Sequence, residues 1–246
     1  MAIRKIKIDS KTVEISYEIL NKNENTDFIV LHGWGSNKEL MKSAFSSFMP
    51  HFRHIYIDLP GFGGSTNKYS LTSNEYFIII DKFIEEIGAE KDIILGHSFG
   101  GKIALLLEPK MLVLLSSAGI PVKKSLKTRI KIALFKALKP IGGDKFYKIF
   151  ATKDVEGMSK NMYETLKNVV DENFEPYFNN FKNDALIFWG KQDSATPLAC
   201  GEKIASLIKK NRFFPMEGDH YFFLKHPKEI TQEIEEYYRE CIHTDL

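Results

Sequence analysis

Residues 93–104 contain the side chain best suited to act as a nucleophile, Ser98. An apolar run that predicts a buried strand ends at Leu95, and apolar residues at helical spacing begin at Ile103. Between them the chain reads Gly-His-Ser-Phe-Gly. A strand that turns directly into a helix strains the middle residue, and glycines on both sides let strand and helix approach closely. The pattern therefore predicts that the Ser98 hydroxyl stands at a rigid, exposed point beside a helix N-terminus.

A second segment, residues 28–36, predicts the hydrogen-bond donors that such a serine needs. An apolar strand there runs into a His-Gly-Trp-Gly turn. Attack of Ser98 on a carbonyl would create a tetrahedral oxyanion, which two fixed N–H donors stabilise. We expect these donors to be the backbone N–H groups of Trp34 and Phe99. His32 is expected to satisfy loop carbonyls and is not assigned to catalysis.

Two further predicted strands are each followed by a residue that can complete a triad. Asp193 follows the strand at 185–190, and His220 follows the strand at 212–216. Catalytic groups of open α/β sheets gather at the carboxyl ends of the strands, and the order Ser, Asp, His is the one expected for this triad. Asp219 is adjacent to His220, but neighbours in an extended loop point in different directions, so Asp193 is preferred. His97 is expected to pack or bond locally, because its side chain should project away from that of Ser98.

These segments resemble the motifs of the α/β-hydrolase superfamily. The matching stretches are LHGWGS, DLPGFGGS, GHSFGG, WGKQDSATP and GDHYFF, which lie in this order within residues 28–223. The resemblance implies Ser98 as the nucleophile, His220 as the general base and Asp193 as the residue that orients it. It also implies Trp34 and Phe99 as oxyanion donors through their backbones. Members of the superfamily with an Asp nucleophile are disfavoured, because the residue at that position is Ser98.

The alternation of strand and helix patterns predicts an α/β-hydrolase fold, with a mostly parallel sheet covered by helices on both faces. Strands are expected at 2–8, 12–20, 28–32, 54–58, 92–96, 111–117, 185–190 and 212–216, the first two as an antiparallel hairpin at the sheet edge. Helices are expected at about 38–48, 72–87, 197–209 and 226–241, the second capped by Thr72 or Ser73 with Glu75 close behind. The helix after Ser98 must be short, because Pro109 cannot continue it.

Residues 120–182 interrupt this alternation with helical patterns and no strong strand. We interpret them as a helical lid inserted into a core formed by residues 1–119 and 183–246. Such lids exclude water and shape the pocket. The first half of the lid is basic, and either a solvated helix face or a docking surface would explain this. The surface would suit an acidic acyl carrier protein or an anionic membrane. The basic residues are Lys123, Lys124, Lys127, Arg129, Lys131, Lys136, Lys139, Lys145 and Lys148.

Composition narrows the class of protein further. The 246 residues, of which 43% are hydrophobic, fit one large α/β domain. A formal net charge of +2 gives no electrostatic reason to expect a nucleic-acid partner. Cys200 and Cys241 lack the spacing of a disulfide framework or a metal site. The first residues lack the apolar region of a signal peptide, and no stretch has the length of an integral membrane segment. We therefore expect a cytoplasmic protein.

The predicted function is a serine carboxylesterase for small-molecule esters with small or medium acyl groups. This chemistry needs no metal and no organic cofactor. Trp34, Phe99, Phe62 and Tyr221 are expected to line the substrate pocket. Thioesterase, lactonase, acyltransferase and carbon–carbon bond hydrolase activities use the same chemistry and stay open. So does a carrier-protein-dependent enzyme, because the LHGWGS stretch and basic lid are similar to those of the pimeloyl-carrier-protein methyl esterases of biotin synthesis. A non-enzymatic ligand receptor on a hydrolase scaffold is the alternative from another class.

Overall fold

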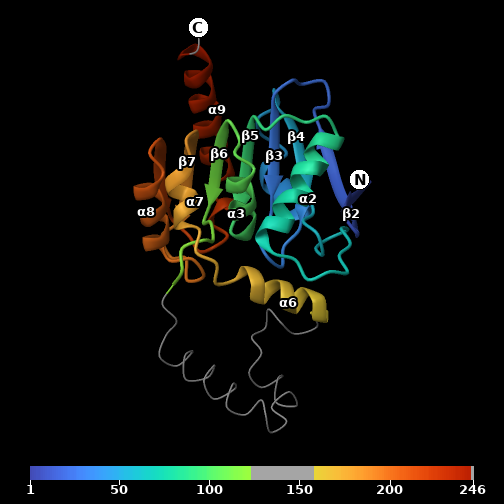
Figure 1. Ribbon diagram of the computed structural model, residues 1–246. Coiled ribbons are helices and arrows are strands. Elements are labelled where there is room, and N and C mark those ends of the chain that lie inside the picture. Colours follow the sequence, from blue (N-terminus) through green and yellow to red (C-terminus); the bar gives the residue numbers. More distant parts are fainter. Residues whose placement is uncertain (123–157, 245–246) are drawn as a thin grey trace.

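Parallel strands make up most of the sheet (Figure 1). The computed structural model describes residues 1–122 and 158–244. The strand order is β1-β2-β4-β3-β5-β6-β7-β8. The β1–β2 hairpin at one edge and the β2–β4 pair are antiparallel, and every other pair is parallel. The predicted α/β class with its mostly parallel sheet is confirmed. The strands are β1 (Ala2–Ile8), β2 (Lys11–Leu20), β3 (Asp27–Leu31), β4 (Arg53–Ile57), β5 (Ile93–His97), β6 (Met111–Leu115), β7 (Asp184–Gly190) and β8 (Asn211–Met216).

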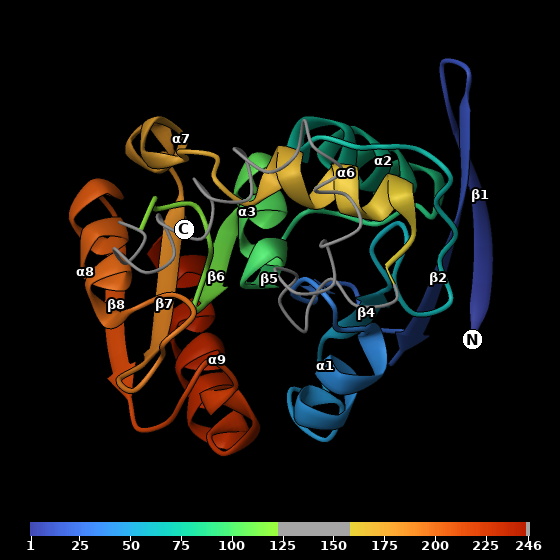
Figure 2. The ribbon, with the colours of Figure 1, turned by 90° about the horizontal axis from the view of Figure 1, so that it is seen from below.

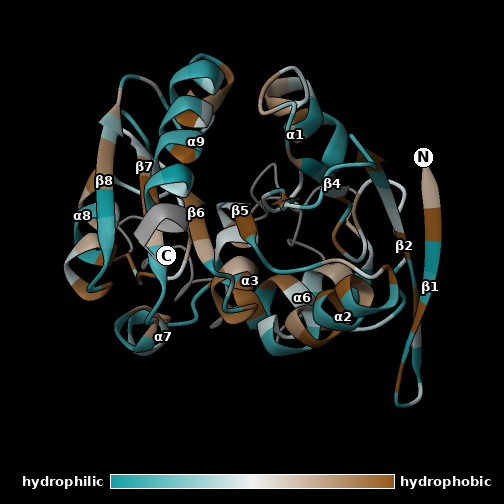
Figure 3. Ribbon diagram, turned by 90° about the horizontal axis from the view of Figure 1, so that it is seen from above, coloured by the Kyte–Doolittle hydropathy of each residue, from teal (hydrophilic) through white to brown (hydrophobic). Residues whose placement is uncertain are grey.

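Helices cover both faces of this sheet, as predicted. Figures 2 and 3 show α1 and α9 on one face and α2, α3 and α8 on the other. The described helices are α1 (Lys38–Phe45), α2 (Ser73–Glu86), α3 (Phe99–Leu106), α6 (Lys160–Val169), α7 (Glu175–Asn180), α8 (Leu198–Leu207), the short 3₁₀ helix η4 (Phe222–Leu224) and α9 (Pro227–Thr244).

The central strands are mostly apolar, with polar residues such as Asp27 and His97 at their ends, because each face of the sheet has its own core. In β3, Phe28 and Val30 enter the core beneath α1 and α9, whereas Ile29 and Leu31 enter the core beneath α2, α3 and α8. Successive side chains of a strand point to opposite faces, so a strand covered on both sides is a nearly continuous apolar run. All five residues of β3 are buried.

Most predicted boundaries lie within one or two residues of the observed ones. Thr72 caps α2 in a reciprocal capping box with Glu75, and α3 is short, as expected from Pro109. The helix predicted at 38–48 instead ends at Phe45. Phe48, at the end of the predicted range, packs against the core from the turn that follows the helix. The last helix continues to residue 244.

Two helices, α6 and α7, lie in the part of the predicted lid that the structure describes, and that part contains no strand. Residues 123–157 lie outside the described residues, so the whole basic run from Lys123 to Lys148 does too. The division into core and lid therefore stays a prediction. Figure 1 shows α6 across the end of the sheet at which the parallel strands finish.

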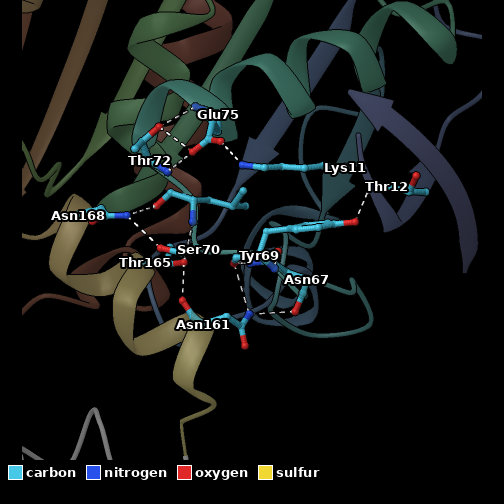
Figure 4. Close-up of polar contacts among 11 residues, drawn as sticks. Lys11, Thr12, Asn67, Tyr69, Ser70, Thr72, Glu75, Asn161, Thr165 and Asn168 are labelled. Carbon is cyan, nitrogen blue, oxygen red and sulfur yellow. Dashed lines mark hydrogen bonds and ion pairs between the residues drawn. The ribbon is translucent and has the colours of Figure 1, made fainter. Parts of the chain in front are cut away.

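Polar side chains on one face of α6 attach it to residues 67–71 (Figure 4). Asn161 donates from Nδ2 to the carbonyl of Asn67 at 3.1 Å. Thr165 accepts from the N–H of Leu71 at 3.0 Å, and Asn168 donates to the Leu71 carbonyl at 3.2 Å. Positions i, i+4 and i+7 share one helix face, so the three side chains bind one extended strip of backbone.

A buried lysine fixes the C-terminal end of α6 to α3. Lys102 is 1% exposed, and its ammonium donates to the Val169 carbonyl at 2.8 Å and to the Glu172 carboxylate. It also lies 4.3 Å from the centre of the Phe174 ring, a cation–π distance. Burial lowers the pKa of Lys102, and the hydrogen bond that it donates to Glu172 opposes that shift. The ammonium is therefore held in the interior by one carboxylate, one carbonyl and one aromatic ring.

Replacing Glu172 should be costly because it leaves this buried charge without a counter-ion. We expect Glu172→Gln to lower the free energy of unfolding by about 2 kcal/mol, since the amide can accept a hydrogen bond but cannot neutralise the ammonium. Adding Lys102→Met should recover most of that loss, because no buried charge remains. Urea unfolding measures both effects. Glu175→Gln is the matched control, since Glu175 pairs with Lys203 on the surface at 3.3 Å. Equal losses in the two single variants would contradict this account.

Candidate active site

Ser98 lies at a strained turn between β5 and α3. Its φ of 51° and ψ of −115° are rarely adopted by residues other than glycine. A Cβ on Gly96 would lie 2.4 Å from the Gly100 carbonyl oxygen, and a Cβ on Gly100 would lie 2.5 Å from the His32 oxygen. Real Cβ contacts are never this short, so both positions require glycine. The turn is therefore held by close backbone packing on both sides of Ser98.

Asp193 and His220 are hydrogen-bonded to each other. His220 Nδ1 donates to Asp193 Oδ2 at 2.7 Å, and the Asp193 side chain is fully buried. The other carboxylate oxygen accepts from the N–H groups of Ala195 and Thr196 at 2.8 and 2.9 Å. Burial by itself would raise the pKa of Asp193, but the His220 and Thr196 hydrogen bonds outweigh it and lower the pKa to about 2. The stability that this ionised carboxylate contributes is present above about pH 3.9 and is lost as the pH falls toward 2.

The alternative acid, Asp219, points elsewhere. Its carboxylate accepts from the N–H of Tyr221 at 2.9 Å, at the start of η4. Neighbouring Glu217 binds Lys191 and Gln192 across the loop. Within the described residues the carboxylate in contact with His220 is that of Asp193.

The structure brings the loop of His220 to the strand end that carries Ser98. The ring centres of His97 and His220 are 4.7 Å apart, and His97 Nε2 lies 3.0 Å from the His220 carbonyl oxygen. No hydrogen bond joins the Ser98 hydroxyl to His220 in the described part of the chain. Contacts between nucleophile and base are often loose before substrate binds.

The turn after β3 lies against Ser98. A Cβ on Gly33 would be 3.1 Å from the Ser98 Cβ, so the residue directly before Trp34 lies against the nucleophile. Phe99 is the first residue of α3, and its N–H therefore has no acceptor within that helix. His32 supports the turn: its Nδ1 donates to the Gly33 carbonyl at 2.7 Å, and its Nε2 accepts from the Leu59 N–H at 2.9 Å. Burial lowers the pKa of His32 to about 4, so the ring is neutral at pH 7.

Three of the four residues predicted to line the pocket lie together. The ring of Trp34 is 4.9 Å from that of Phe62 and 5.6 Å from that of Phe99, in edge-to-face contacts. Met162 of α6 lies near this cluster. A Cβ placed on Gly61, the residue before Phe62, would be 2.4 Å from the Met162 sulfur. Tyr221 lies apart from this cluster, with its ring 5.6 Å from that of His220.

Thr196 also belongs to this site, although the sequence interpretation did not assign it. Its hydroxyl donates to Asp193 Oδ2 at 2.9 Å, and its N–H donates to Oδ1. An Asp whose side chain accepts from backbone N–H groups two and three residues later forms a common turn. The stretch Asp-Ser-Ala-Thr-Pro could have indicated this role.

A sequence profile of the alpha/beta hydrolase family matches residues 28–233. The chain belongs to the alpha/beta hydrolase family. Among the described residues of this hydrolase, no group of three or more His, Cys, Asp or Glu side chains could hold a metal ion. Within the same residues, no helix is both long and apolar enough to cross a bilayer.

Curated relatives of this hydrolase share only part of its length. It is 35% identical over 80 residues to a pimeloyl-(acyl-carrier protein) methyl ester esterase of Pectobacterium carotovorum, covering 32% of this chain and 30% of that protein. The protein of the same name from Hamiltonella defensa is 34% identical over 99 residues, covering 39% and 37%. The chain thus spans about a third of the length of the curated relatives it matches.

Solved structures resemble the hydrolase over its whole length. An esterase from Thermogutta terrifontis superposes with a TM-score of 0.71 at 16% identity, covering 98% of this chain and 99% of that one. The esterase from Exiguobacterium antarcticum gives 0.75 at 20% identity, covering 96% and 98%. At such identities the likeness shows the fold alone.

The two candidate acids can be separated by substitution. Asp193→Asn should lower kcat by about 10³–10⁴-fold, because the amide would favour the wrong tautomer of His220. Asp219→Asn should leave kcat within about threefold, since the amide oxygen still accepts from the Tyr221 N–H. Steady-state kinetics with an activated ester measures both, and circular dichroism checks that both variants fold. The opposite ranking would move the orienting role to Asp219.

Proposed function

We propose that this hydrolase cleaves carboxylic esters of small or medium acyl groups through Ser98, His220 and Asp193. The observation that carries the proposal is the hydrogen bond between Asp193 and His220 beside the strained turn of Ser98. A buried carboxylate that holds Nδ1 of an imidazole leaves Nε2 free to accept a proton. The partial matches to curated methyl ester esterases support ester substrates.

In the proposed mechanism His220 removes the Ser98 proton as the hydroxyl oxygen attacks the ester carbonyl. The backbone N–H groups of Trp34 and Phe99 stabilise the negative oxygen that forms. The carbon–oxygen bond to the alcohol then breaks, and His220 returns the proton to the leaving alcohol. Water attacks the acyl-enzyme with His220 again as base, which releases the acid and restores Ser98. The aromatic cluster of Trp34, Phe62 and Phe99 would bind the acyl group.

Removing the nucleophile tests this mechanism. Ser98→Ala should fold normally and lose kcat by ~10⁴-fold or more, because the acyl-enzyme cannot form. A fluorophosphonate should modify wild-type protein at Ser98 alone. A panel of p-nitrophenyl esters of graded chain length gives the kinetics and the preferred acyl group. Near-normal turnover by the alanine variant, or modification at another residue, would refute the proposal. Absence of turnover on every ester, thioester and lactone would favour a ligand receptor.

A second candidate is a methyl ester esterase whose acyl group is carried by an acidic protein. The names of the curated relatives and the basic run beginning at Lys123 favour it. An acidic carrier would be attracted by such a run, and salt would weaken that attraction.

Charge reversal distinguishes this candidate from a general esterase. Changing Lys123, Lys124, Lys127 and Arg129 to Glu should raise KM for a carrier-bound methyl ester in a salt-sensitive way. Turnover of small p-nitrophenyl esters should stay the same. Reversal of Lys209 and Lys210, two exposed lysines that directly precede β8, is the matched control. Equal losses on both substrates, or none on either, would leave the basic run as ordinary surface.

A further inference from the structure

His97 is a buried histidine that the proposed mechanism does not use. It is the last residue of β5, directly before Ser98, and it is 1% exposed. Its Nε2 lies 3.0 Å from the backbone carbonyl oxygen of His220. A carbonyl can only accept, so Nε2 carries the proton and donates it. Nδ1 is then unprotonated, and among the described residues it is buried without a hydrogen-bond partner.

The ring of His97 contacts two loops that belong to different parts of the candidate site. On one side it packs against the loop of the general base, with ring centres 4.7 Å from His220 and 4.9 Å from Phe223. On the other side it lies against the turn after β3, which carries the proposed oxyanion donor Trp34. A Cβ on Gly33 in that turn would be 2.8 Å from Nδ1 of His97. The side chain of His97 therefore contacts both the loop of His220 and the turn after β3.

We propose that His97 is a positioning residue, which holds the backbone of His220 in place so that its imidazole faces Ser98. The inference rests on the proposed function and deepens it. Asp193 holds the imidazole of His220 by Nδ1, and His97 holds the same residue by its main-chain carbonyl. Two separate hydrogen bonds thus fix the ring and the backbone of His220, and one bond alone would let the ring shift.

The neutral state of His97 suits this role. Burial, followed by repulsion from His220, lowers the pKa of His97 to about 3. The ring therefore carries no charge at pH 7. A positive His97 would repel the imidazolium that forms on His220 in each half-reaction, whereas the neutral ring donates its hydrogen bond without opposing that charge.

Two substitutions separate the hydrogen bond from the packing. His97→Phe keeps an aromatic ring of similar volume but removes the N–H donor. His97→Gln keeps an N–H that can reach the position of Nε2 but removes the ring. Should the Phe variant fail to fold, His97→Asn replaces it, because that amide is too short to reach the His220 carbonyl.

The experiment measures kcat and KM on a p-nitrophenyl ester, the rate of Ser98 modification by a fluorophosphonate, and the downfield proton resonance of the Asp193–His220 hydrogen bond. We expect His97→Phe to lower kcat and the modification rate by about 10²-fold with KM unchanged, because a small displacement of the base is enough for such a loss. The downfield resonance should broaden in this variant. His97→Gln should recover most of the rate and the sharp resonance.

Equal losses in the Phe and Gln variants would overturn the inference, because restoring the N–H donor would then recover none of the rate. Wild-type rates in the Phe variant would overturn it as well. Failure of the proposed function is a different result: wild-type protein would then not be modified at Ser98, or Ser98→Ala would keep its turnover. Thermal unfolding of each variant confirms that the comparison is made between folded proteins.

Discussion

The close approach of α3 to β5 is the constraint on which the rest of this structure depends. Because Gly96 and Gly100 lack a Cβ, the helix begins immediately where the strand ends, and Ser98 takes the strained position between them. The same approach puts the N–H of Phe99 next to the hydroxyl and brings the turn after β3 into contact. It also directs Lys102 away from the sheet toward α6. A side chain at either glycine would separate strand from helix and displace all of these groups together.

Buried polar groups at the carboxyl end of the sheet each bind a partner from a distant segment. Asp193 holds His220, Lys102 holds Glu172, and the N–H of His97 holds the His220 carbonyl. In an interior of low dielectric such contacts are strong, and an unpaired member is costly. They therefore align loops that follow different strands without requiring a long contact surface between those loops.

Sequence patterns predicted the strands and most helix boundaries, because these features depend on local periodicity and turn chemistry. Asp193 could be preferred to Asp219 because it follows a strand. The contacts of Lys102 with Glu172 and of His97 with His220 could not be predicted, since they join residues 70 and 123 positions apart. The attachment of α6 to residues 67–71 depends in the same way on packing between distant segments. Such contacts between distant segments arise from the packing of the folded sheet, and local patterns do not contain them.

The proposed mechanism requires Ser98 to carry the acyl group during turnover. Mixing the protein with a p-nitrophenyl ester, quenching with acid within milliseconds and mapping peptides by mass spectrometry would detect that adduct. We expect the peptide containing Ser98 to gain the mass of the acyl group at the rate at which p-nitrophenol first appears, and to lose it when the substrate is exhausted. An adduct on another residue would refute the mechanism. An initial burst of p-nitrophenol with no acyl group on the protein would refute it as well.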